Sequence, residues 1–138
     1  MLAPVDRFFE LRFESIGGLG AHGAGQILAS AAVLRMGFNG AQFSSYGSEK
    51  KGSVIRSFVR LGPANRPVRT SAPVEAPDVI VVFHAALLGN PLTFSGLKAD
   101  GFLIYNAPAG PAPAALAALP RTARAIRVDA LGIAVAEK

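Results

Sequence analysis

Glycines gather directly after the first strand-like segment, where a phosphate-binding loop would lie. Residues 18–23, Gly-Leu-Gly-Ala-His-Gly, have the spacing G-x-G-x-x-G of dinucleotide-binding loops. In such loops, backbone N–H groups at the positive end of a helix approach a phosphate closely. Gly18 and Gly20 are therefore candidate cofactor-binding residues. The alternative is that these glycines permit a tight strand-to-helix turn and close helix packing without any ligand.

The acidic residue that a nicotinamide dinucleotide would need is missing. It is expected about 20 positions after the loop, at the end of the second strand, where it binds a ribose hydroxyl. Here that place holds Phe43, Ser44 and Ser45, and the first acid afterwards is Glu49. NAD is therefore disfavoured, whereas a bound phosphate or pyrophosphate remains open.

Hydroxyl and basic side chains follow the second strand. Ser45 and Tyr46 stand at its expected carboxyl end, where open α/β sheets bind ligands. Lys50 and Lys51, with Gly52 after them, could meet phosphate groups, and a solvated turn is the alternative for this pair. His22 and His84 have no acid at ligand spacing, so the sequence predicts neither a metal site nor a catalytic residue.

Short strands and helical stretches alternate along the chain. The sequence predicts strands at 8–16, 41–44, 54–61, 79–83, 102–105 and 125–128, and helices at 22–36 and 111–119. In the first helix, Ile27, Ala31 and Leu34 recur with helical spacing. A turn at 62–65 predicts a β-hairpin between 54–61 and 67–70. We expect a single α/β domain over 1–138: a Rossmann-like open, mostly parallel sheet with flanking helices and an inserted antiparallel β-hairpin.

Composition excludes several classes of site. The chain has no cysteine, which rules out disulfides, thiolate zinc sites and cysteine-ligated iron–sulfur clusters within it. No signal peptide opens the sequence, and no apolar run reaches the roughly 18 residues of a membrane span, so we expect a cytoplasmic protein without membrane contact.

Net charge is +5, and much of it lies between residues 50 and 69. A nucleic-acid partner is one explanation for such a surface. However, Phe43, Tyr46 and Phe58 alternate as core residues of strands do, rather than as a stacking platform. Nucleic acid therefore ranks third, behind an anionic cofactor and a protein partner.

Residues 43–60, Phe-Ser-Ser-Tyr-Gly-Ser-Glu-Lys-Lys-Gly followed by an alternating strand, closely resemble a family signature. It belongs to the γ subunit of 2-oxoacid:acceptor oxidoreductases, in which Pro-Ser-Phe-Gly-Pro-Glu-Arg-Arg-Gly leads into a strand. Residues 17–20 and 27–29 are similar to the family's Gly-Gly-Gln-Gly and the helix after it. Residues 67–69 and 75–81 resemble its return strand and its Pro-Asp-led buried strand, so the resemblance spans most of 10–106.

The resemblance implies a role within a larger enzyme. Members decarboxylate a 2-oxoacid on thiamine diphosphate, pass electrons through iron–sulfur clusters to ferredoxin or a similar acceptor, and release an acyl-CoA. Thiamine diphosphate, Mg²⁺ and the clusters belong to partner subunits. The γ chain would be inactive alone, supplying scaffolding and a share of the coenzyme A site. A free-standing nucleotide- or dinucleotide-binding domain is the alternative.

Three departures from the family pattern have physical consequences. Leu19 replaces the glutamine, residues 15–16 replace a frequent Gly-Arg, and Lys50 and Lys51 replace an arginine pair. Leucine can only pack where glutamine would donate and accept, and lysine lacks the planar fork of arginine. The chain also ends soon after a helix begins at Leu131, whereas family γ chains continue. Either this member is short or its final part lies outside the sequence.

Residues 107–119 are rich in alanine and proline and carry no charge. A neutral segment of this kind is unusual on the exposed face of a solitary monomer. We expect it to be covered by another subunit, or by a second copy of this chain when the chain is produced alone.

Overall fold

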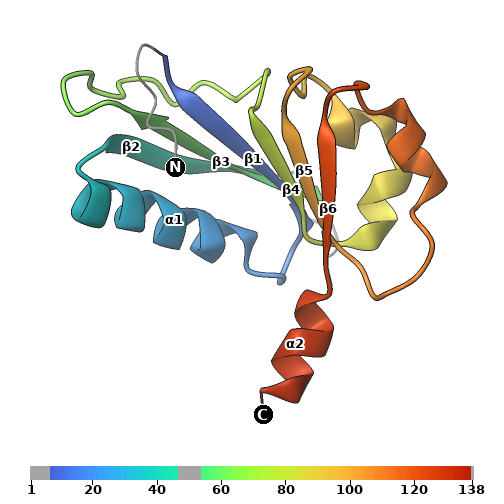
Figure 1. Cartoon of the computed structure of the whole chain (residues 1–138). Coiled ribbons are helices and arrows are strands. Elements are labelled where there is room, and N and C mark those ends of the chain that lie inside the picture. Colours follow the sequence, from blue (N-terminus) through green and yellow to red (C-terminus); the bar gives the residue numbers. More distant parts are fainter. Residues whose placement is uncertain (1–6, 47–53, 138) are drawn as a thin grey trace.

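One six-stranded sheet organises the chain, seen in a computed structural model that describes residues 7–46 and 54–137 (Figure 1). Its order is β2-β3-β1-β4-β5-β6. The strands are β1 (Phe9–Ile16), β2 (Asn39–Tyr46), β3 (Val54–Gly62), β4 (Val79–Val82), β5 (Phe102–Asn106) and β6 (Arg124–Val128). Neighbours among β1, β4, β5 and β6 pair in parallel, whereas β3 is antiparallel to both β1 and β2. The predicted open α/β sheet with an antiparallel hairpin is confirmed.

The long helix α1 (Ala21–Met36) lies along one face of the sheet, over β1, β2 and β3 (Figure 1). Its buried positions are all small residues, namely Ala21, Gly25, Ala29 and Ala32. Small side chains let the helix approach the strands closely, so these positions meet the core. The apolar residues whose spacing predicted the helix point away from the core, with Ile27 73% and Leu34 79% exposed. Their spacing identified the helix but not its buried side.

The opposite face of the sheet has its own core at β4 and β5. Because side chains alternate along a strand, Ile80 and Val82 point there, while Val79 and Val81 point toward the α1 side. The cover consists of three short 3₁₀ helices, η1 (Ala85–Gly89), η2 (Pro91–Phe94) and η3 (Ala114–Ala118). The last helix, α2 (Ala130–Ala136), extends away from the sheet (Figure 1).

The neutral segment 107–119 packs against its own sheet. Leu116 and Leu119 contact the core of Ile80 and Leu103, and the helix predicted at 111–119 is the 3₁₀ helix η3. This inward packing is the alternative to cover by another chain, and such cover stays a prediction for the part of the segment that is exposed. Its apolar side chains turn inward, and what remains exposed is mainly alanine and proline.

The predicted pairing of β3 with residues 67–70 is also wrong. Both edges of β3 are already occupied, by β1 and by β2, so a third partner has no edge to join. Residues 67–70 instead run without strand pairing. The guanidinium of Arg60 donates to the carbonyls of Thr70 and Ala72, both at 3.1 Å, and so holds this connection against the sheet. Within the described ranges, no helix has the length and apolar character needed to cross a membrane.

Candidate functional site

The glycine loop connects β1 to α1 at the carboxyl edge of the parallel strands. Gly18 and Gly20 have φ angles of 89° and 84°, in the left-handed region that favours glycine. No side chain caps α1, and its first turn contains no acidic residue. The first N–H groups of the helix are therefore open to an anion, and their dipole favours one. Both predicted glycines lie where the sequence placed them.

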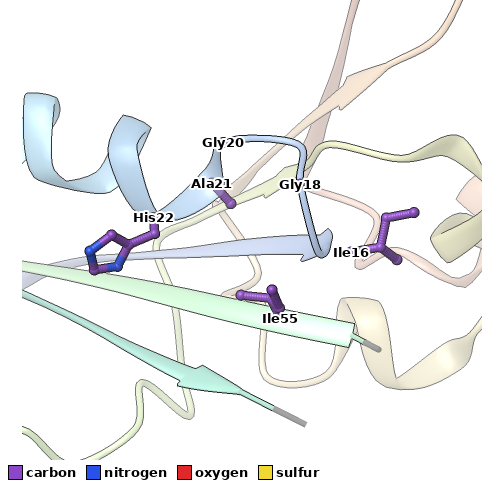
Figure 2. A pocket seen from close by; sticks show the side chains of 6 residues that line it. All are labelled: Ile16, Gly18, Gly20, Ala21, His22 and Ile55. Atoms are coloured by element: carbon purple, nitrogen blue, oxygen red, sulfur yellow. The ribbon is translucent and has the colours of Figure 1, made fainter. Parts of the chain in front are cut away.

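This loop borders a hollow of about 200 Å³, shown in Figure 2. Its lining consists of Ile16, Gly18, Gly20, Ala21, His22 and Ile55. Pockets that enclose a whole small-molecule ligand measure roughly 300–1,000 Å³. The described residues can therefore receive one group of about phosphate size, but a complete cofactor would need walls from elsewhere.

A chain of hydrogen bonds leads from this hollow into the sheet. His22 Nδ1 lies 2.8 Å from Ser44 Oγ, and Gln42 Nε2 lies 3.2 Å from the same Nδ1. Gln42 Nε2 also donates to Ser57 Oγ at 2.9 Å. When the Ser44 hydroxyl donates to Nδ1, the imidazole proton resides on Nε2. His22 Nε2 then carries the donor hydrogen of the ring.

Sequence reasoning missed Gln42 and Ser57 as members of this group. A signal was present, since Gln42, Ser44 and Ser57 are polar residues at positions of β2 and β3 that face α1. Polar side chains on the helix-covered face of a sheet need partners. Alternation along the strands identified this face of the sheet. It did not show that Gln42 would contact His22, Ser44 and Ser57 together.

The predicted hydroxyl residues separate onto two faces of β2. Ser44 reaches His22, whereas the exposed Ser45 is paired with Arg56 of β3 and so belongs to the opposite face. The backbone of Tyr46 ends β2 opposite Ile55. Lys50, Lys51 and Gly52 lie outside the described residues. The residues that flank this gap, Tyr46 and Val54, are both at the carboxyl edge of β1.

On the face away from α1, a buried carboxylate holds two arginines. Glu14 is 1% exposed, and its Oε1 lies 2.8 Å from Arg12 Nε and 3.0 Å from Arg56 Nε. The Arg12 contact is an ion pair without hydrogen-bond geometry, and Arg12 instead donates to the carbonyls of Thr93 and Ser95. Burial lowers the pKa of Arg12, and the charge of Glu14 opposes this. The cluster joins β1 to β3 and η2.

His84 has a structural role at the end of β4. Its Nδ1 accepts a hydrogen bond of 3.1 Å from the backbone N–H of Ala86, which caps η1. Among the described residues, no cluster of three or more His, Asp or Glu side chains is arranged to hold a metal ion.

The fold and the loop together define an α/β domain with a glycine-rich strand-to-helix turn that no side chain caps. The family model described as pyruvate ferredoxin/flavodoxin oxidoreductase matches residues 10–137. The chain therefore belongs to this family, and the resemblance seen in residues 43–60 is confirmed.

Individual relatives agree with this assignment. Pyruvate synthase subunit PorC of Thermotoga maritima is 40% identical over 100 residues, which are 72% of this chain and 50% of that protein. The common γ subunit of the pyruvate/ketoisovalerate oxidoreductases of Pyrococcus furiosus is 38% identical over 97 residues, or 70% of this chain and 51% of that one. The crystal structure of pyruvate oxidoreductase subunit PORC from T. maritima superposes with a TM-score of 0.78 at 34% identity, covering 96% of this chain and 67% of that chain. The chain thus spans about half the length of the curated relatives it matches.

Proposed function

We propose that this chain is the γ subunit of a thiamine diphosphate-dependent 2-oxoacid:ferredoxin, or similar acceptor, oxidoreductase. It supports oxidative decarboxylation of a 2-oxoacid to an acyl-CoA. The observation that carries the proposal is the family match over residues 10–137, together with 40% identity to a pyruvate synthase subunit. Because the chain has no cysteine, the iron–sulfur clusters are held by partner subunits, as are thiamine diphosphate and Mg²⁺.

The share of catalysis that falls to this chain is the positioning of coenzyme A. Coenzyme A is rich in phosphate, and the open N–H groups of α1 attract anions. His22 adds a donor at the same hollow, and Lys50 and Lys51 belong to the connection that starts and ends at this edge. At about 200 Å³ the hollow receives one phosphate group, so the rest of the cofactor lies on a partner subunit.

The alternative, a free-standing dinucleotide-binding domain, fits the geometry less well. In a dinucleotide fingerprint, the third glycine allows close packing of helix on strand. Here that glycine is Gly23, and a Cβ added to it would meet nothing within 4 Å. The glycine in close contact with the sheet is Gly25, outside the fingerprint. The third glycine of the G-x-G-x-x-G sequence therefore does not make the close helix–strand contact that it makes in dinucleotide-binding domains.

Reconstitution with partner subunits tests the proposal. The chain is co-expressed with the thiamine- and cluster-binding subunits of its host, and CoA-dependent reduction of ferredoxin by a 2-oxoacid is measured. We expect the chain to co-purify, and preparations without it to lose CoA-dependent turnover. A variant at the exposed Arg69, Arg69→Ser, serves as a control that retains activity. Full activity without this chain, or NAD binding by the chain alone, contradicts the proposal.

A further inference from the structure

The parallel half of the sheet is covered on only one face by the described residues. On the side where α1 covers β1 to β3, strands β4, β5 and β6 present Val81, Ile104, Ile126 and Val128. Ile126 remains 45% exposed and Val128 36% exposed. Parallel strands occur almost only in sheets whose two faces are both covered by helices. This open sheet face, defined by Val81, Phe83, Ile104, Ile126 and Val128, therefore lacks a layer.

A small hollow marks the carboxyl end of the open sheet face. It measures about 180 Å³, and its lining includes Val81, Phe83, Ile104, Val128 and Ala130. This is below the size of a cofactor pocket, and the five residues that define the open sheet face are all apolar. The nearest charge on the same face is Arg124, which lies over the ring of Phe102 at the other end of β6. The dimensions and chemistry of the hollow suit an inserted apolar side chain better than a small-molecule ligand.

The adjacent helix α2 cannot supply the missing layer. It has seven residues and leads away from the sheet (Figure 1). Its own apolar side chains are uncovered, with Leu131 70%, Ile133 57% and Val135 58% exposed. Sheet face and helix together form one apolar surface at the end of the described chain.

The relatives contain polypeptide that could form this layer. The T. maritima PORC structure matches 96% of this chain, but a third of that relative lies outside the match. We propose that the open sheet face and α2 bind an amphipathic helical segment equivalent to that remaining part of the relatives. Helices cover parallel strands, and α2, whose apolar side chains are uncovered, has only seven residues. The unmatched third of the relative is longer, which favours this occupant over a second copy of the chain.

Photo-crosslinking in the native complex tests this occupant. p-Benzoylphenylalanine is placed at Ile126, or at Leu92 as a control, and crosslinked peptides are identified by mass spectrometry. Leu92 is 63% exposed but lies in η2, on the opposite side of the sheet. We expect position 126 to capture a segment that aligns with the unmatched third of PORC, and position 92 not to capture it. Capture of residues 1–138 of a second copy, capture of a cluster- or thiamine-binding subunit, or no capture at position 126 overturns the proposal.

A charge placed on the open sheet face gives an independent measurement. The Ile126→Asp variant should no longer bind the helical segment, whereas the Leu92→Asp variant should still bind it. Circular dichroism of each variant shows whether the sheet still folds. If the Ile126→Asp variant does not fold, the crosslinking experiment still tests the proposal. Both readouts are independent of catalysis, so they can fail or succeed separately from the proposed function. Retention of the segment by a folded Ile126→Asp variant contradicts the proposal.

Discussion

His22 Nδ1 lies 2.8 Å from Ser44 Oγ, which connects the first turn of α1 to the carboxyl end of β2. The connection continues through Gln42 to Ser57, so α1 contacts the β2–β3 hairpin through polar groups at the end where the glycine loop lies. The hydrogen bonds of Gln42 therefore depend on how closely α1 approaches the sheet.

Gly25 permits that close approach, and replacing it should destabilise the protein. A Cβ at this position would lie 2.7 Å from Ser57 Oγ and 3.1 Å from Gln42 Cγ. We expect Gly25→Ala to lower the free energy of unfolding by about 1–3 kcal/mol, the usual effect of overpacking. Urea denaturation measures the change. Gly23→Ala is the matched control in the same helix and should be neutral or stabilising by up to about 1 kcal/mol. Equal stabilities of the two variants would show that α1 has room to move.

Removing the buried carboxylate should leave a buried cation without its counter-charge. Arg12 is 3% exposed and pairs with Glu14 at 2.8 Å. We expect Glu14→Leu to cost about 3–5 kcal/mol of stability, because breaking a buried pair on one side is strongly destabilising. The double variant Arg12→Met with Glu14→Leu should recover much of this loss. Urea denaturation gives the free energy of unfolding of the single and the double variant, and Glu75→Gln, at an exposed position, is the control. A single variant as stable as the parent would contradict this account of the cluster.

The lysine pair should affect coenzyme A and not the oxoacid. In the assembled enzyme, replacing Lys50 and Lys51 by alanine removes two charge-assisted contacts, each worth on the order of 1.5–3 kcal/mol. We expect the KM for coenzyme A to rise at least about tenfold, while the KM for the 2-oxoacid stays within about twofold. Arg35→Ala, in the last turn of α1, removes a charge far from the site and is the control. Unchanged KM values in the lysine variant would assign the pair to a solvated turn.

Thiamine diphosphate should not bind to the isolated chain. The chain has no cysteine for a cluster and no Gly-Asp-Gly sequence of the kind that begins a diphosphate–metal motif. We therefore expect no heat of binding in calorimetry with thiamine diphosphate and Mg²⁺, and no oxidoreductase activity. The reconstituted complex is the positive control. Binding by this chain alone in the micromolar range would overturn the assignment of cofactors to partner subunits.

Much of the fold could be predicted because local patterns were strong. Continuous apolar runs identified β4 and β5, and the glycines at 17–20 located the turn into α1. Position along the chain also placed Gly18, Gly20 and Ser45 at the carboxyl edge, because the glycines follow β1 and Ser45 lies near the end of β2, which runs in the same direction as β1. Lys50 and Lys51 remain a prediction from the resemblance.

The sequence by itself determined the family, the glycine loop and the order of β1 to β6 and α1, although it also predicted a strand at 67–70 that the structure lacks. Only the tertiary structure decided that β3 pairs with β2, that α1 buries alanines rather than Ile27 and Leu34, and that Glu14 lies between two arginines. Periodicity shows which residues share a face of an element. Which face is buried, and which strand takes a free edge, depends on competition among segments far apart in the chain. That competition is resolved by close packing and hydrogen bonding of the whole sheet.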